Sequence, residues 1–170
     1  KDNLGDFSSK IRVQEIVDEN FQDYKKPAMF ISSVMCDFKC LKELNMDIGI
    51  CQNMKISTMP NKIINISYIY EKYISNPITK AIVIGGLEPF LQFQEIFNLI
   101  SYFRNHNCED DFVIYTGYYA NEISEEINKL KNFKNIIIKY GRFVPNSYAV
   151  YDSVLGVNLS SENQHAEKLS

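Results

Sequence analysis

The sequence predicts an α/β fold, an incomplete (partial) βα barrel with mainly parallel strands, formed by a single domain. Three observations lead to this prediction. Short, β-branched apolar runs recur along the chain, as is typical of strands buried on both faces of a parallel sheet. Stretches with helical periodicity separate these runs. The chain has 170 residues and a mass of 19.7 kDa, the size of one domain.

The apolar runs give the expected strands. Those with the length of buried strands are residues 28–31, 81–84, 112–115 and 136–138. Before them, residues 10–17 alternate between polar and apolar side chains, which indicates a half-buried strand. One more strand is expected at 154–159, ahead of a polar stretch.

Helical patterning fills the intervals between these runs. Apolar residues that would share one helix face form three sets: Ile66, Ile69, Tyr70 and Tyr73; Phe93, Ile96, Phe97, Ile100 and Phe103; Ile123, Ile127 and Leu130. Strands that alternate with helices imply βαβ units with right-handed crossovers, and hence a mainly parallel sheet. We expect a core of about residues 11–164, with flexible ends at 1–9 and 165–170.

Charge and hydropathy exclude several classes of partner. The formal net charge is -3 with acidic and basic residues interspersed, so no basic stripe is present that would neutralise a row of phosphates. No apolar run approaches the roughly 20 residues of a membrane-spanning helix. The start of the sequence does not resemble an export signal. We therefore expect a cytoplasmic protein that binds neither nucleic acid nor membranes.

Three of the four cysteines, Cys36, Cys40 and Cys51, follow one of the buried-strand runs. In a reducing compartment, grouped thiols indicate a metal site more than disulfides. Thiolates suit iron–sulfur clusters and zinc, and three of them would leave one iron of a four-iron cluster open to a small molecule. Structural zinc usually has four protein ligands, so a zinc site that includes Cys108 is the alternative. We otherwise interpret Cys108 as a surface or loop thiol.

A second motif, Gly85-Gly86-Leu87-Glu88-Pro89, directly follows another apolar run. The glycines would let backbone approach a ligand closely, and the carboxylate could pair with an ammonium group. Alternatively, the motif is a plain strand-to-helix turn with the proline as first helical residue.

Ligands of such folds gather at the carboxyl ends of the parallel strands. Four loops are expected to meet there: the cysteine loop, the Gly-Gly turn and residues 115–118 and 139–142.

Together the two motifs resemble those of the radical S-adenosylmethionine superfamily. The three cysteines are similar to its C-x3-C-x2-C signature, and Gly85 to Pro89 are similar to its Gly-Gly-Glu-Pro motif. The chain departs from the family pattern in two ways: ten residues separate Cys40 from Cys51, and Leu87 is inserted before the glutamate. On this resemblance, residues 1–170 form one radical S-adenosylmethionine domain.

Within the superfamily, the chain resembles the activating protein of the anaerobic ribonucleoside-triphosphate reductase, a glycyl-radical activase. The matching segments are Cys51-Gln52-Asn53, residues 115–118 and residues 160–164. The resemblance implies that Cys36, Cys40 and Cys51 hold a [4Fe-4S] cluster whose fourth iron binds S-adenosylmethionine. It further implies reductive cleavage to a 5′-deoxyadenosyl radical, which takes a hydrogen atom from a glycine of the reductase large subunit. A flavodoxin-like or ferredoxin-like protein would supply the electron.

The resemblance also implies a binding site for S-adenosylmethionine. Gly85, Gly86 and Glu88 would contact the methionine moiety. Ile50 would lie against the adenine, with Phe38 as the competing candidate, and Asn53 belongs to the same expected site. Thr116 and Lys139 are at strand ends from which they would reach ribose or carboxylate oxygens.

Two other functions remain open from the sequence. The radical could act on another glycyl radical enzyme, a peptide or a small molecule. The chain could also be a non-enzymatic zinc–thiolate interaction module.

Overall fold

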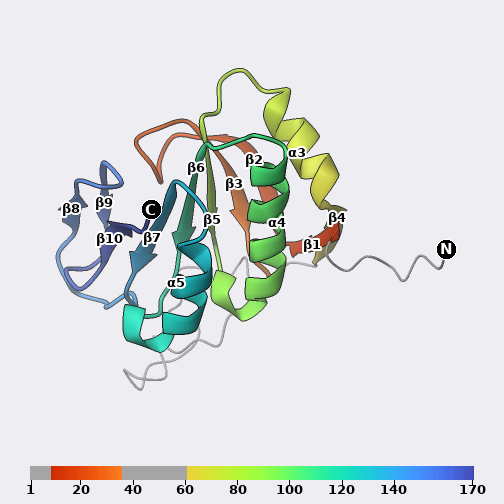
Figure 1. Cartoon of the computed structure of the whole chain (residues 1–170). Coiled ribbons are helices and arrows are strands. Elements are labelled where there is room, and N and C mark those ends of the chain that lie inside the picture. Colours follow the sequence, from red (N-terminus) through yellow and green to blue (C-terminus); the bar gives the residue numbers. More distant parts are fainter. Residues whose placement is uncertain (1–8, 36–60) are drawn as a thin grey trace.

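A six-stranded sheet organises the fold in the computed structural model, which describes residues 9–35 and 61–170 (Figure 1). The strand order is β10-β7-β6-β5-β3-β2. The central strands are parallel: β3 (Ala28–Ser32), β5 (Ala81–Gly85), β6 (Asp111–Tyr115) and β7 (Ile136–Tyr140). The edge strands pair antiparallel: β2 (Glu15–Asn20) and β10 (His165–Lys168). The predicted single α/β domain with a mainly parallel sheet is confirmed.

The helices of the crossovers all pack on one face of this sheet. They are α3 (Ile66–Ile74), α4 (Phe93–Asn105), which follows the 3-10 turn η3 (Pro89–Gln92), and α5 (Ser124–Leu130), which follows η4 (Ala120–Glu122). Because β3, β5, β6 and β7 are added in sequence order, right-handed crossovers bring every helix to the same side. The predicted apolar helix faces lie in or against the larger core, except for Phe97, and Ile69, Phe103 and Leu130 are fully buried there.

The opposite face of the sheet, which we call the helix-free face, carries a smaller core. Val83, Val113 and Ile137 contribute to it from the strands, and Leu155 and Leu159 from the C-terminal segment. That segment forms a hairpin of β8 (Val150–Asp152) and β9 (Val157–Leu159), which lies near the β10 edge (Figure 1). The strand expected at 154–159 is confirmed only for its second half, β9, because the chain turns at Gly156 (φ +72°).

The alternating run at 10–17 also divides into two strands, at Gln14. β1 (Lys10–Val13) pairs with β4 (Lys62–Asn65) in a separate two-stranded sheet, whereas β2 joins the central sheet. The Gln14 N–H donates to the carbonyl of Ser32 (2.9 Å), and its side-chain amide donates to Asn61 Oδ1 (2.7 Å). These bonds hold the point at which the chain passes from one sheet to the other.

The end of the chain, which we expected to be flexible from residue 165, instead contributes β10 to the central sheet. Beyond the strand, the Leu169 N–H donates to the Ile136 carbonyl (2.8 Å), and the Ser170 carbonyl accepts from the Asn135 N–H (3.0 Å). Edge strands often carry polar side chains at exposed positions. β10 is of this kind, so a search for apolar runs does not recognise it as a strand.

Candidate functional site

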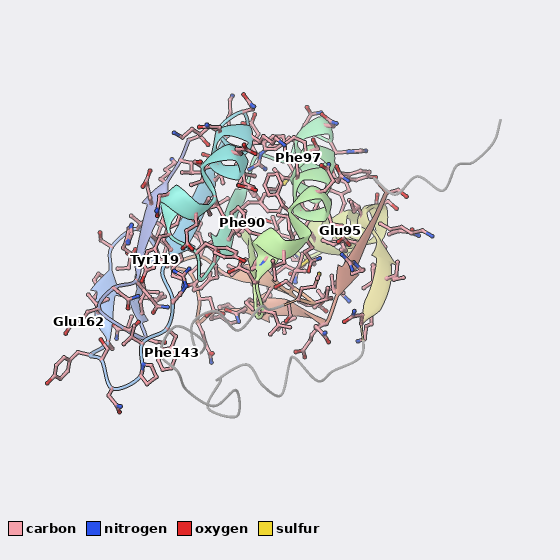
Figure 2. All side chains as sticks on the ribbon, turned by 90° about the horizontal axis from the view of Figure 1, so that it is seen from below. Phe90, Glu95, Phe97, Tyr119, Phe143 and Glu162 are labelled. Atoms are coloured by element: carbon pink, nitrogen blue, oxygen red, sulfur yellow. The ribbon has the colours of Figure 1, made fainter. Side chains whose placement is uncertain are left out.

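The loops that follow β5, β6 and β7 meet at the carboxyl ends of the parallel strands, as predicted. The Gly117 N–H, after β6, donates to Glu88, after β5 (2.8 Å). The Gly141 N–H, after β7, donates to the Tyr118 carbonyl (3.1 Å). Figure 2 views the molecule from this end, with Phe90 from the first loop near the centre. Of the fourth expected loop, the described residues extend only to Met35.

Glu88 ties the first two of these loops together. Its side chain is buried and accepts hydrogen bonds from the N–H groups of Gly117 (2.8 Å) and Phe90 (3.0 Å). The Thr116 hydroxyl donates to the same carboxylate, at 2.8 Å and 2.9 Å from its two oxygens. Burial raises the pKa of Glu88, although these hydrogen bonds oppose the rise. Glu88 also caps η3, with Pro89 in the first helical turn, as the plain-turn interpretation predicted.

Replacing Glu88 with Gln should lower the free energy of unfolding by about 2 kcal/mol, because a buried donor left unpaired costs roughly 1–3 kcal/mol. The Gln amide offers one acceptor oxygen, so the N–H of Phe90 or Gly117 would face an NH2 group. Urea denaturation of E88Q and the wild type measures the difference. Glu125→Gln, at an exposed position in α5, is the matched control and should change stability by at most about 0.5 kcal/mol. Equal stability of E88Q and E125Q would contradict the structural role of Glu88.

The backbone that leads into Cys36 is fixed to the Gly-Gly turn. Four hydrogen bonds hold it: Ser33 N–H and Ser33 Oγ to the Gly85 carbonyl (2.8 Å and 2.7 Å), Val34 N–H to Gln92 Oε1 (2.9 Å), and Glu88 N–H to the Met35 carbonyl (2.6 Å). Sequence reasoning missed Ser33 and Gln92, because isolated polar residues form no motif. The place of Ser33 shortly before the first cysteine was the available signal.

Gly86 has the backbone conformation that favours glycine, with φ +80°. A Cβ atom at this position would lie 2.2 Å from Ser32 Oγ, so only a bare backbone fits against that hydroxyl. Gly85 is restricted differently: a Cβ there would lie 3.3 Å from Tyr115 Cβ and 3.4 Å from the Phe30 ring. The close approach expected for the two glycines is thus made, within the described residues, to neighbouring strands.

Lys139 and Thr116 lie at strand ends, as the sequence predicts. Lys139 is only 6% exposed, and its ammonium group donates to the Gly141 carbonyl (3.0 Å) and lies 5.7 Å from the ring centre of Tyr115. Thr116 is 1% exposed and accepts from the Tyr118 N–H (3.0 Å) while donating to the nearby carboxylate. Neither side chain is a solvated surface group.

Residues 161–164, which carry part of the family resemblance, brace the loop after β7. Asn163 Nδ2 donates to the Arg142 carbonyl (2.7 Å) and to Tyr119 Oη (2.8 Å). Gln164 Nε2 donates to the Gly141 carbonyl (3.2 Å). Arg142 in turn forms an ion pair with Glu122 (2.5 Å). The Asn-Gln segment therefore holds two carboxyl-end loops in place, near Tyr119 in Figure 2.

The remaining sequence-predicted site residues fall outside the described part of the chain: Cys36, Phe38, Cys40, Ile50, Cys51 and Asn53. Cys108 lies in the loop before β6, as expected, but it is buried and not on the surface. Burial raises the pKa of its thiol. Over residues 9–35 and 61–170, no three His, Cys, Asp or Glu side chains are grouped so that they could hold a metal ion.

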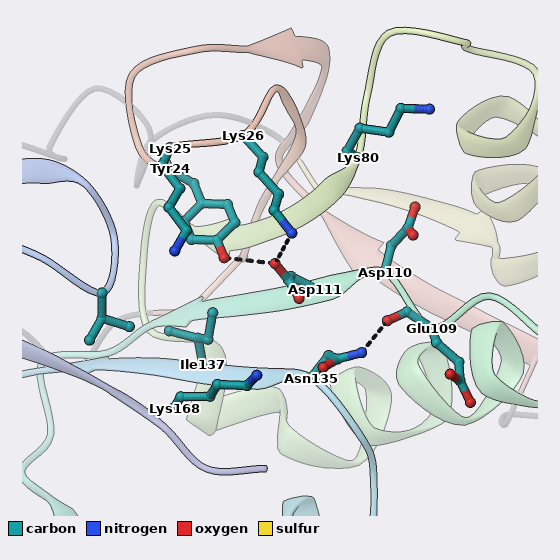
Figure 3. A pocket seen from close by; sticks show the side chains of 11 residues that line it. Tyr24, Lys25, Lys26, Lys80, Glu109, Asp110, Asp111, Asn135, Ile137 and Lys168 are labelled. Carbon is teal, nitrogen blue, oxygen red and sulfur yellow. Dashed lines mark hydrogen bonds and ion pairs between the residues drawn. The ribbon is translucent and has the colours of Figure 1, made fainter.

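A pocket of about 440 Å³ opens at the opposite, amino ends of the strands (Figure 3). Lysines and acidic residues line it, among them Asp111 at the start of β6. Asp111 Oδ2 accepts from Tyr24 Oη (2.7 Å) and pairs with Lys26 Nζ (2.8 Å). Asp110 accepts from the Tyr73 hydroxyl (2.5 Å). Much of the acidic charge is thus engaged within the protein, and none of the described motif residues lines the pocket.

Asp111→Asn should lower the free energy of unfolding by about 1 kcal/mol at neutral pH, a modest value because Lys26 is half exposed and screened by solvent. Burial alone would raise the pKa of Asp111, but the hydrogen bonds from Lys26 and Tyr24 hold it below its ordinary value. The lowered pKa stabilises the fold above the unfolded-state pKa of about 4, and this stabilisation is lost as pH falls through the folded-state pKa.

We therefore expect the free energy of unfolding of D111N to lie closer to that of the wild type at acidic pH than at neutral pH. Urea denaturation at both pH values measures this difference. Asp18→Asn is the control, because the pair of Asp18 with Lys72 (3.1 Å) is largely exposed. If D111N lost more free energy of unfolding relative to the wild type at acidic pH than at neutral pH, the lowered pKa of Asp111 would be contradicted.

Comparison with known proteins bears on the cysteine motif. No curated protein matches the chain. Within the described residues, no helix has both the length and the apolar composition needed to cross a membrane. A family model described as a 4Fe-4S single cluster domain matches residues 27–165, a span that runs from the start of β3 to the start of β10 and includes the grouped cysteines. A [4Fe-4S] cluster, as the cysteines predict, is the cofactor that this description names. The chain belongs to the family of 4Fe-4S single cluster domains.

Proposed function

We propose that the chain is a radical S-adenosylmethionine enzyme that cleaves S-adenosylmethionine reductively and generates a glycyl radical on the anaerobic ribonucleotide reductase. One observation carries the proposal. Met35, which directly precedes Cys36 in sequence, accepts a hydrogen bond from Glu88 of the Gly-Gly turn (2.6 Å). The entrance to the cysteine motif and the second motif of the resemblance therefore share one end of the sheet, where ligands of such folds bind.

The residues at this end fit a cluster with a small zwitterionic ligand. Cys36, Cys40 and Cys51 would hold a [4Fe-4S] cluster, since thiolates are its usual protein ligands. The bare backbone of Gly86 lies against the buried hydroxyl of Ser32, at the end of β3, and both would adjoin the cluster. Once bound and reduced by an external donor, the cluster would supply the electron for cleavage of the carbon–sulfur bond of S-adenosylmethionine. The protein contributes orientation and exclusion of water.

Each described residue of the site would have a distinct task. The backbone of Gly85 and Gly86 would bind the methionine moiety. Glu88 would hold that turn in place, because its carboxylate already accepts hydrogen bonds from two loops. Lys139 and Thr116 would orient ribose or carboxylate oxygens.

Phe38, Ile50 and Asn53 would complete the site on the adenine side. The helix-free face would be the inner face of an incomplete barrel. Since an open barrel encloses a small substrate poorly, a large protein substrate suits it better.

Anaerobic reconstitution with iron and sulfide tests the chemistry. After reduction with dithionite in the presence of S-adenosylmethionine, we expect 5′-deoxyadenosine and methionine as products by liquid chromatography and mass spectrometry. A sample without reductant is the control and should release neither. A cluster-loaded sample that produces no 5′-deoxyadenosine when reduced would contradict the proposal.

The protein substrate needs a separate experiment. Incubation with the large subunit of an anaerobic ribonucleotide reductase should give a glycyl radical signal in electron paramagnetic resonance spectra. A flavodoxin-like or ferredoxin-like protein should replace dithionite as the electron donor. Cleavage of S-adenosylmethionine without a radical on a competent reductase would favour another glycyl radical enzyme, a peptide or a small molecule as substrate.

The structure gives little support to a zinc–thiolate module with Cys108 as fourth ligand. Cys108 precedes β6 and lies at the amino end of the parallel strands. Met35, which leads to Cys36, is bonded at their carboxyl end. Metal analysis of anaerobically purified protein separates the two possibilities, since the module requires zinc without iron.

A further inference from the structure

Ser32, the last residue of β3, carries a buried hydroxyl that has no partner among the described residues. The residue is 0% exposed, and its Oγ makes no hydrogen bond within this part of the chain. Its carbonyl, in contrast, accepts from the Gln14 N–H (2.9 Å). Buried polar groups in folded proteins nearly always have a partner, and one without it costs roughly 1–3 kcal/mol. The hydroxyl is therefore suited to a group that the described part of the chain does not provide.

Ser33, the next residue, differs from Ser32 because its hydroxyl has a partner within the protein. Ser33 uses both its N–H and its hydroxyl on the Gly85 carbonyl (2.8 Å and 2.7 Å). Ser32 pairs with Gly85 in the strand ladder but points its hydroxyl toward the Gly86 turn, where a Cβ atom would lie 2.2 Å from Oγ. Only glycine leaves this hydroxyl beside bare backbone, at the turn where the proposed ligand would bind.

Lys139 and Ser32 lie on the helix-free face, at the carboxyl ends of their strands. β3, β5, β6 and β7 are neighbours in order, and their ends carry Ser32, Gly85, Tyr115 and Lys139. The buried ammonium group of Lys139 lies 5.7 Å from the Tyr115 ring centre. An O–H donor on the same side as a buried cation favours an anionic acceptor.

We propose that Ser32 is a ligand-binding residue whose hydroxyl donates a hydrogen bond to an anionic acceptor held against the Gly86 turn. Resting on the proposed function, this inference names the carboxylate of S-adenosylmethionine or an inorganic sulfide of the cluster as acceptor. Both groups are anions that accept hydrogen bonds and have no proton to donate.

The test is anaerobic equilibrium binding of S-adenosylmethionine to cluster-loaded wild type and Ser32→Ala. If the acceptor is the carboxylate, we expect the dissociation constant of S-adenosylmethionine to be about tenfold higher for S32A, the factor that corresponds to 1.4 kcal/mol for one charge-assisted hydrogen bond. Thr79→Val is the matched control, because Thr79 Oγ1 is also buried and has no partner among the described residues, but it precedes β5 at the other end of the strands. T79V should bind within about twofold of the wild type.

Two further measurements identify the acceptor and exclude misfolding. With a carboxylate acceptor, decarboxylated S-adenosylmethionine should bind equally to S32A and the wild type, and the cluster midpoint potential without ligand should be unchanged. With a sulfide acceptor, that potential should shift in S32A. S32A without ligand should be at least as stable as the wild type in urea, because it removes an unpaired buried hydroxyl.

Each result either supports or overturns the inference. If S32A and the wild type bind S-adenosylmethionine equally and share one midpoint potential, Ser32 binds no ligand, while the proposed function stands. If the cluster-loaded wild type itself does not bind S-adenosylmethionine, the proposed function fails and the inference fails with it.

Discussion

Replacement of any one of Cys36, Cys40 and Cys51 by Ala should remove the iron–sulfur cluster and, with it, the proposed formation of 5′-deoxyadenosine. The chain provides three grouped thiolates, and a four-iron cluster that loses one of three protein ligands retains too few bonds to stay in place. Iron and sulfide content after anaerobic reconstitution, together with the visible charge-transfer absorbance, measures the loss. Each variant should fall to a small fraction of the wild-type content.

Cys108→Ala is the matched control for these variants. Cys108 lies in the loop that connects α4 to β6 and is buried in the larger core, so its loss should lower the free energy of unfolding by about 1 kcal/mol through a small cavity. Its iron content should equal that of the wild type. Full iron in C51A, or loss of iron in C108A, would require a different ligand set.

The order of strands and helices in the central sheet was predictable because local patterns specify it. Continuous apolar runs become β3, β5, β6 and β7, and periodic apolar faces become α3, α4 and α5. β10 was not predictable in this way. Residues 165–168 bury little of their side chains, and the strand exists because its backbone pairs with β7. Such pairing depends on a neighbour that is distant in sequence.

The candidate site shows the same division between local and distant information. The Gly-Gly turn and the proline that starts η3 follow from adjacent residues. The contacts of Glu88 do not, since Thr116 and Gly117 are 28 and 29 residues away. A sequence motif can therefore mark the position of a carboxylate without indicating that other loops already engage it. That the Ser32 hydroxyl has no partner among the described residues is likewise apparent only once β3 and β5 are side by side.

Gly86→Ala should lower the free energy of unfolding by roughly 3 kcal/mol, the sum of a left-handed backbone (about 1 kcal/mol) and an overpacked contact (about 1–3 kcal/mol). The φ of Gly86 is +80°, and the added Cβ would lie 2.2 Å from Ser32 Oγ and 3.1 Å from Ser32 Cβ. Urea denaturation measures the change. Gly117→Ala is the control: a Cβ there would lie 3.6 Å from Glu88 Oε1, an ordinary contact, and the change should stay within about 0.5 kcal/mol.

A double-mutant cycle separates the two causes of the Gly86→Ala loss. Ser32→Gly removes both side-chain atoms that the new Cβ would meet, but it leaves the backbone conformation of residue 86 unchanged. The double variant should therefore be about 1–2 kcal/mol more stable than the sum of the single changes predicts. Strict additivity would mean that backbone strain alone accounts for the loss. Wild-type stability of G86A would mean that the turn relaxes away from Ser32, so that Ser32 and the turn would not form one site.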